Sequence, residues 1–256
     1  MVRLGLLSVA VLAGVSAASA QSPQTGPYLR LGLGGGTTLD ANVGNNDSQR
    51  PLICGNALCT ASGSLSKTGS GVGLEAAAGY QALPWLGAEL AYTHLTGPKL
   101  NDQDAADRSF SANITTNALM ANAYVAVPGN YGNLRPYVGG GVGVASVAAS
   151  DVTVLSPGGT TTRVFPGATN TNFAYQAFVG TEVSLTDVVG LDMQVRYTNY
   201  GDFSGAAGRP TINGASNPAF ASSPGISGTN QTVMVYFSPR FYGSNSGKTY
   251  KPIGGN

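Results

Sequence analysis

Charged residues are sparse in this chain of 256 residues, so those that fall in regularly alternating segments are the first candidates for chemistry. Two of them are arginines, Arg30 and Arg196. The acids and neutral polar residues with the same pattern are Glu75, Glu89, Glu182, Asp192, Gln81, Asn122, Gln176 and Gln194. Residues two apart in a strand lie on one face. If the segments are strands of a closed barrel, the face that these residues share points into the barrel. It would then form either the lining of a selective channel or an ion-paired plug, and we favour the plug because buried charges need partners.

Both arginines are expected to lie close to Glu75, Glu89, Glu182 or Asp192, and two arrangements within this set are preferred. A hairpin brings the segment of Arg30 beside that of Glu75, so these side chains should meet. Arg196 follows Asp192 by four residues on the same face, and the preceding segment places Glu182 beside it. Because the acids outnumber the arginines, one carboxyl group is expected to be protonated or bonded only to neutral donors.

The two cysteines, Cys54 and Cys59, lie in a segment rich in small polar residues. The export signal described below would deliver them to an oxidising compartment, where a disulfide is the default expectation. A metal-binding pair is the alternative, but the single histidine, His94, is distant in the sequence. The sequence has no zinc pattern and no phosphate-binding loop, so we expect neither a metal nor a cofactor.

The chain divides into three parts. Arg3, the apolar run Leu4–Val15 and the small residues up to Ala20 are typical of a secretory signal peptide, predicted to be cleaved after residue 20. A retained anchor helix is the alternative, although this run is shorter than the roughly 20 residues that a spanning helix needs. Residues 21–241 suit a single barrel domain, and residues 242–256 form a polar tail that we expect to be a short periplasmic extension.

Eight segments of the mature chain show the two-residue period of a strand. They are Tyr28–Gly36, Gly71–Leu83, Leu86–Leu95, Thr116–Val127, Arg135–Val144, Phe173–Ser184, Val189–Tyr200 and Gln231–Phe241. Each is close to the 9–11 residues with which a tilted strand crosses a bilayer. Short and long links alternate between them, so the long links all leave from the same end. This order predicts an all-β fold, an eight-stranded antiparallel up-and-down transmembrane β-barrel.

Composition favours this membrane barrel over a soluble β-sandwich or barrel. Only 10% of the residues are charged, against about 25% in soluble domains. The polar faces are largely Gly and Ala, which suits the narrow interior of an eight-stranded barrel. Aromatic residues collect near the strand ends, as in the two girdles of membrane barrels. Those near the short links are Tyr80, Trp85, Phe237 and Phe241, and those near the long links are Tyr92, Tyr175, Tyr197 and Tyr200.

Four segments carry a family likeness: GVGLEAAAGY at 71–80, GAELAY at 87–92, RPYVGGGVGV at 135–144 and AYQAFVG at 174–180. In these the chain resembles the small outer-membrane barrels of the OmpA and OmpX type, which include opacity-like surface proteins of the porin family. The resemblance implies a location in the outer membrane of a Gram-negative-type bacterium. Such barrels usually end on an aromatic residue, whereas here Phe241 is followed by the polar tail.

Two functions stay open at this point. The barrel could have a structural or surface-interaction role through long loops that contact host, matrix or other cells, or it could pass small solutes as a porin. A lipid-modifying enzyme is a weaker alternative, because His94 is the single possible base and no serine follows it by two residues. We therefore expect no enzyme. Expected partners are outer-membrane lipid and lipopolysaccharide, the outer-membrane assembly machinery and a surface ligand; no basic stretch suggests nucleic acid.

Overall fold

The structure, a computed structural model, describes residues 25–39, 70–103, 109–129, 131, 133–155, 162–186, 188–206, 211–216 and 227–243. The predicted signal peptide, the pair Cys54 and Cys59, and the tail beyond Gly243 lie outside these residues. The regular secondary structure of the described part consists of strands. No helix in these ranges is long and apolar enough to cross a membrane.

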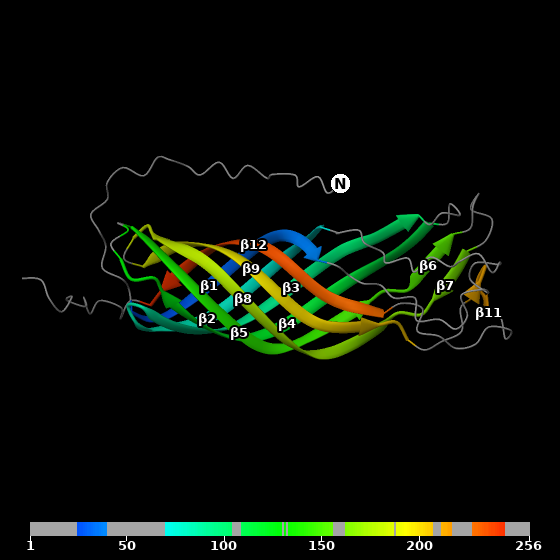
Figure 1. Ribbon diagram of the computed structural model, residues 1–256, viewed down its shortest axis with the longest axis horizontal. Helices are drawn as coiled ribbons and strands as arrows, with labels where there is room; N and C mark the ends of the chain where they lie inside the picture. Colours follow the sequence, from blue (N-terminus) through cyan, green and yellow to red (C-terminus); the bar gives the residue numbers. More distant parts are fainter. Residues whose placement is uncertain are drawn as a thin grey trace, which may run out of the picture.

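Eight long strands form a closed ring. They are β1 (Gly26–Leu39), β2 (Ser70–Leu83), β3 (Leu86–Gln103), β4 (Ser109–Ala126), β5 (Leu134–Ala149), β8 (Ala168–Ser184), β9 (Val189–Ser204) and β12 (Ser227–Tyr242). Each pairs antiparallel with the next of these strands along the chain, and β1 pairs with β12, which closes the barrel (Figure 1). The predicted eight-stranded antiparallel up-and-down barrel is confirmed.

The strands extend further than predicted at the end from which the long links leave. β3 continues to Gln103 instead of ending at Leu95, and β4 begins at Ser109 instead of Thr116. The sequence missed these extensions because residues outside the hydrocarbon have no reason to alternate between apolar and polar. The extended part of the wall is therefore not visible in the hydrophobic pattern.

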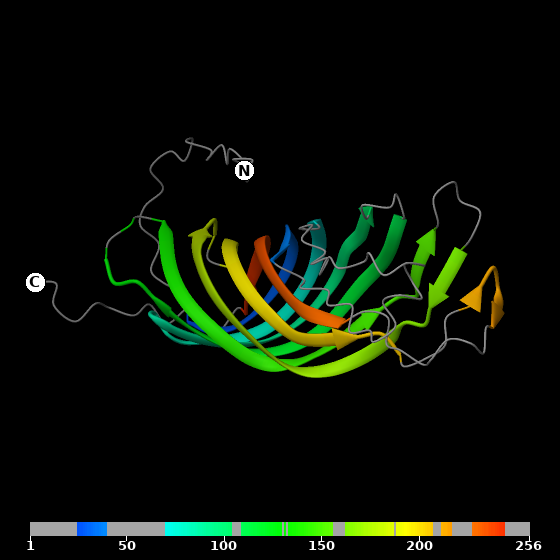
Figure 2. The ribbon, with the colours of Figure 1, turned by 45° about the vertical axis from the view of Figure 1, so that its right-hand side comes forward.

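Two short hairpins continue the sheet beyond the ring at the same end. One consists of β6 (Val152–Leu155) and β7 (Thr162–Phe165), and the other of β10 (Thr211–Ile212) and β11 (Ala215–Ser216). β6 pairs with the start of β4, and β10 pairs with β7. Figure 2 shows them as the light green and orange arrows past the rim of the barrel. Links that the sequence assigned wholly to solvated loops thus contain strands.

Alternate residues of each strand face opposite sides of the wall. In β1, Leu29 and Leu31 are 61% and 57% exposed on the outer face, whereas Tyr28 and Arg30 are buried inside. β12 follows the same rule, with Phe237 outside. An outer face of Leu, Val and Phe is favourable against hydrocarbon, because the backbone polar groups are already paired within the closed ring.

Glycines on the inner face leave room for tyrosine rings. A Cβ added to Gly79 would lie 2.2 Å from Cζ of Tyr28, and one added to Gly87 would lie 2.3 Å from Cζ of Tyr124. No side chain can be placed at these distances without moving the ring. The Gly-rich inner face is therefore a packing requirement of a narrow barrel that holds large side chains.

Candidate functional site

The inner face of the barrel carries a network of buried charges. Arg30, on β1, binds two acids: its Nη2 lies 2.8 Å from Glu75 Oε1 and 2.5 Å from Glu89 Oε1. The expected contact between Arg30 and Glu75 is present. The contact with Glu89, on β3, belongs to the wider set of acids expected near Arg30, and it reaches past the neighbouring strand into the interior of the barrel.

Arg196, on β9, also binds Glu75 and reaches it across the barrel. Its Nη2 donates to Glu75 Oε1 at 3.0 Å, and its Nη1 contacts the other carboxylate oxygen. Its Nε donates to Gln194 Oε1 at 2.8 Å. Of the acids expected near Arg196, Glu75 is therefore the one in contact, and the preference for Asp192 and Glu182 is corrected, because four residues along a strand separate two side chains by about 13 Å.

Two arginines that the sequence analysis left out complete the network. Arg240, on β12, binds Glu182 Oε2 and Asp192 Oδ2 through its two terminal nitrogens, each at 3.0 Å. Arg135, at the start of β5, also contacts Glu182. Four arginines therefore face four acids among the described residues, and the expected surplus of acid is corrected. The signal for Arg240 was present in the sequence, because residue 240 alternates with the outward-facing Phe241.

Neutral polar groups connect the charges. Asn122 donates to Glu89 Oε1 at 3.1 Å, and Gln176 donates to Asn122 Oδ1 at 2.5 Å. Thr93 donates to Glu75 Oε2 at 3.0 Å. The structure thus brings all ten polar residues of the initial candidate set to the inner face. Hydrogen bonds of this kind satisfy the carboxylate oxygens that the arginines leave open.

Toward the short-link end, an aromatic cluster is interleaved with the charges: Arg240 lies 4.4 Å from the ring centre of Tyr28 and donates to the hydroxyl of Tyr124 at 3.1 Å. The members of this cluster are Tyr28, Tyr124, Ala126, Tyr137, Phe178 and Tyr242. The hydroxyls of Tyr28, Tyr137 and Tyr242 donate to Glu89, Asp192 and Glu182 at 2.9, 2.8 and 2.6 Å. Tyr242, which we had assigned to the tail, is the last residue of β12. Residue type alone does not distinguish these inward-facing tyrosines from girdle tyrosines; the face of the strand on which each one lies must also be known.

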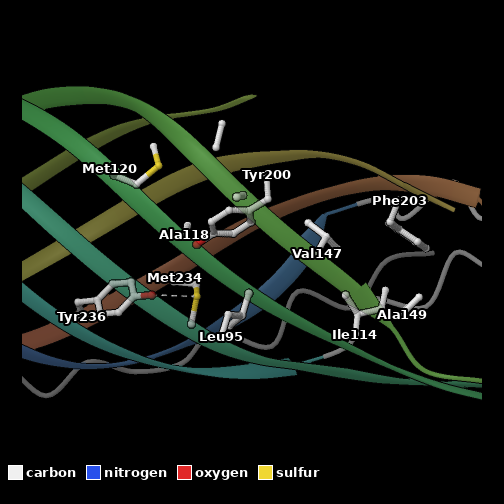
Figure 3. Packing of buried hydrophobic residues seen from close by; sticks show 12 residues of the cluster. Leu95, Ile114, Ala118, Met120, Val147, Ala149, Tyr200, Phe203, Met234 and Tyr236 are labelled. Carbon is white, nitrogen blue, oxygen red and sulfur yellow. Dashed lines mark hydrogen bonds between the residues drawn. The ribbon is translucent and has the colours of Figure 1, made fainter. Parts of the chain in front are cut away.

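An apolar layer lies on the long-link side of the charges. Its side chains are drawn in Figure 3. Its members are Leu95, Ile114, Ala118, Met120, Ala145, Val147, Ala149, Ala174, Tyr200, Phe203, Met234 and Tyr236. The hydroxyl of Tyr236 lies 3.4 Å from Sδ of Met234 within this layer. Met120 and Met234, which interrupt the polar faces in the sequence, are thereby explained. The inner face thus has a mixed charged and aromatic part toward the short-link end and an apolar layer on its long-link side.

The candidate girdle residues lie on the outer face with one exception. Tyr80, Trp85, Tyr92, Tyr175 and Phe237 are between 45% and 57% exposed there, and Tyr197 is half-buried on the same face. Tyr200 is instead buried in the apolar layer, which corrects its assignment to the long-link girdle. Its position follows from alternation, because Tyr200 has the same parity as the inward-facing Arg196.

His94 lies apart from the network on the outer face. Its Nδ1 is 2.8 Å from Asn117 Oδ1, which also accepts a hydrogen bond from the hydroxyl of Tyr92 at 2.9 Å. Glu89, the acid of the same strand, is buried on the opposite side of the wall. Neither contact supplies the nucleophile or the acid of a hydrolytic triad.

Comparisons with known proteins agree with this architecture. The family described as "Outer membrane protein beta-barrel domain" matches residues 6–234. Neisserial surface protein A is similar in structure, with 14% identity over 86% of this chain and 98% of that chain and a TM-score of 0.49. The attachment invasion locus protein Ail of Yersinia pestis, solved with the heparin analogue sucrose octasulfate, has 12% identity over 85% of this chain and 99% of that chain, with a TM-score of 0.40.

The N-terminal β-barrel domain of OprF from Pseudomonas aeruginosa has 10% identity over 85% of this chain and 99% of that chain, with a TM-score of 0.35. No curated protein matches the sequence. The family match covers most of the chain and coincides with the closed barrel found in the structure. The chain therefore belongs to the outer membrane protein β-barrel family, and it is a protein of the Gram-negative-type outer membrane.

Proposed function

We propose that this protein is a non-conducting barrel that acts at the cell surface through its long loops. The observation that carries the proposal is the near-complete burial of the charges inside the barrel. The side chains of Arg30, Arg196 and Arg240 are each 1% exposed, and that of Asp192 is 0% exposed. A water-filled channel would leave its lining accessible to water, as in larger barrels with open interiors.

The packing of the interior supports the same proposal. The apolar layer closes the long-link side of the ion pairs, so an ion would have to pass a zone that offers it no comparable solvation. Each of the four arginines is paired with at least one carboxylate, so none of these charges stands alone to coordinate a passing solute. The porin alternative has no such supporting feature in the described part of the chain.

Conductance of the purified protein in a planar bilayer tests the proposal. We expect no channel steps from the natural protein, with an open porin as the positive control in the same set-up. Removing one side chain alone should leave the interior filled, so Arg240→Ala and Met234→Gly are each expected to conduct no better than the parent. Steady conductance of the natural protein would overturn the proposal in favour of a porin.

The surface role rests on the asymmetry of the two ends. All long links, and the hairpins β6–β7 and β10–β11, belong to one end, which in up-and-down barrels of this kind is the external one. A cell that displays the protein should bind a host or matrix surface more strongly than a cell that displays a version with these links replaced by short turns. Equal binding by both would contradict a loop-mediated role.

The remaining assignments belong to the same proposal. We infer that residues 1–20 are removed on export, that the tail after β12 stays in the periplasm, and that the assembly machinery inserts the barrel. The outer face would contact lipid and lipopolysaccharide. We also infer that the protein is not an enzyme, since the hydrogen bonds of His94 to Asn117 serve an outward-facing polar contact.

A further inference from the structure

The wall of the barrel splits between β8 and β9 near the external end. The ladder between these strands ends at the pair Tyr175 and Asn199. Beyond it, β8 stays paired with β5 as far as Ala168, and β9 stays paired with β12 as far as Ser204. Both strands therefore continue, but their facing edges are no longer joined by backbone hydrogen bonds.

A local irregularity of β9 causes the split. Gly201 has φ of +82°, a left-handed conformation that favours glycine, and the register between β9 and β12 shifts at this level. A Cβ on Gly201 would lie 2.5 Å from Cβ of Asn172 on β8. The bend thus turns the end of β9 away from the ladder while its backbone stays close to one side chain of β8.

Asparagine side chains take the place of the missing ladder. Nδ2 of Asn172 donates to the carbonyl oxygens of Tyr200 and Asp202 at 3.2 and 2.5 Å. Nδ2 of Asn170 donates to the carbonyl oxygen of Ser204 at 2.9 Å. Above them, the backbone N–H of Ala206 donates to the carbonyl of Pro166 at 3.1 Å and joins the two chains again. The result is a window in the wall, closed below and above.

A pocket of about 400 Å³ occupies this window. Its lining is Asn170, Asn172, Asp202, Phe203, Ser204, Gly228 and Thr229. Thr229 donates to Asp202 Oδ1 at 2.6 Å, which fixes the carboxylate at the pocket wall. Within the described ranges, Asp202 Oδ2 and Asn172 Oδ1 accept no hydrogen bond. Asn172 bonds the carbonyl groups of Tyr200 and Asp202 through its nitrogen, which leaves its oxygen open. The pocket therefore presents acceptors and a negative charge.

We propose that this window binds a neutral, hydroxyl-rich ligand, namely an uncharged saccharide of a surface glycan. Sugar hydroxyls donate to carboxylate and amide oxygens, and the hydroxyls of Ser204 and Thr229 can exchange bonds with them. Hydrogen bonds to a carboxylate are about twice as strong as neutral ones, so Asp202 is the principal contact. The inference rests on the proposed surface role, because it names the chemistry of a partner at the external end.

The charge of the pocket separates this ligand from two others. A sulfated or phosphorylated glycan would bring its anions against Asp202, and the lining offers no cation to receive them. A calcium ion needs six to eight oxygens and usually several carboxylates, whereas the lining contains one acid. The pocket thus suits a neutral polyol better than an anion or a metal.

Isothermal titration of the detergent-solubilised full chain tests the inference. The neutral probes are chitotriose and lactose, the anionic probe is a heparin tetrasaccharide, and calcium chloride is the metal probe. We expect a neutral probe to bind at millimolar concentration and the other two not to bind. Asp202→Asn should weaken that binding about tenfold, since it removes a charge-assisted hydrogen bond.

Asp151→Asn is the matched control. Asp151 is an exposed acid at the same end that accepts a hydrogen bond from the backbone of Gly167 at 2.8 Å, outside the pocket. Its substitution should leave saccharide binding unchanged. The inference is overturned if no neutral probe binds, if heparin or calcium binds in a way that depends on Asp202, or if both substitutions have the same effect. These outcomes leave the non-conducting barrel intact, because conductance tests that proposal separately.

Discussion

Arg30 and Arg240 stand directly opposite each other on β1 and β12, yet the shortest ion pairs of their guanidinium groups are with different acids. Arg30 turns to Glu75 and Glu89, and Arg240 turns to Glu182 and Asp192, whose other oxygen lies 3.8 Å from Arg30. Like charges directly opposite in a sheet destabilise the pair. The opposition is tolerated here because each cation is neutralised on its own side of the strand pair, so the seam that closes the barrel is also where two halves of the charge network meet.

The substitution Arg240→Ala should lower the stability of the barrel substantially. It leaves Glu182 and Asp192 buried with one cationic partner fewer, and breaking a buried pair in this way costs about 3–5 kcal/mol. The free energy of unfolding by urea in detergent micelles is the measurement. Arg240→Lys is the control, since it keeps the charge but loses the two terminal nitrogens that bind separate acids. Its loss of stability should be smaller than that of Arg240→Ala. An unchanged unfolding midpoint for Arg240→Ala would contradict the network.

A double-mutant cycle should show that Arg196 is coupled more strongly to Glu75 than to Asp192. Arg196 and Glu75 are in contact across the barrel, so their alanine substitutions should be non-additive by about 0.5–3 kcal/mol. Arg196 and Asp192 have no direct contact and are linked through Gln194 and Tyr137, so their coupling energy should be smaller. Unfolding free energies of the single and double variants give both values. Stronger coupling to Asp192 would restore the arrangement expected from the sequence.

Neighbouring glycines of β1 should respond differently to alanine. A Cβ on Gly34 would lie 2.6 Å from the ring of Tyr236, which is fully buried, whereas a Cβ on Gly35 meets nothing within 4 Å. Gly34→Ala should therefore cost about 1–3 kcal/mol by overpacking. Gly35→Ala, on the outer face, should stay within about 0.5 kcal/mol of the parent. Equal effects of the two changes on the unfolding free energy would show that the inner face is not packed as described.

Cys54 and Cys59 are predicted to form a disulfide in the exported protein. The pair lies outside the described residues, and the prediction follows from the oxidising compartment alone. Alkylation of freshly isolated, denatured protein should label no thiol before reduction and two after it. Reduction should barely change the unfolding midpoint, because the backbone hydrogen bonds of the barrel lie elsewhere. Two reactive thiols before reduction would disprove the bridge.

Much of the fold could be predicted because a lipid environment imposes a simple rule on each strand. Leu29 and Leu31 must face hydrocarbon, so Arg30 between them must face inward, and the same alternation indicates the faces of all eight strands. Outside the hydrocarbon the rule does not apply, so these parts of the sheet were not predicted. They are the extension of β3 to Gln103 and the hairpins β6–β7 and β10–β11, which lie beyond the alternating segments.

The sequence by itself determined which side chains enter the barrel, whereas only the tertiary structure decided which of them meet. Arg30 and Glu75 could be paired because a hairpin makes their strands neighbours. Arg196 reaches Glu75 from 121 positions away, because strand tilt and closure bring distant parts of the wall together across a narrow interior. The split beside Gly201 also depends on tertiary structure, since the irregularity in β9 opens the wall by leaving the neighbouring strand β8 unpaired.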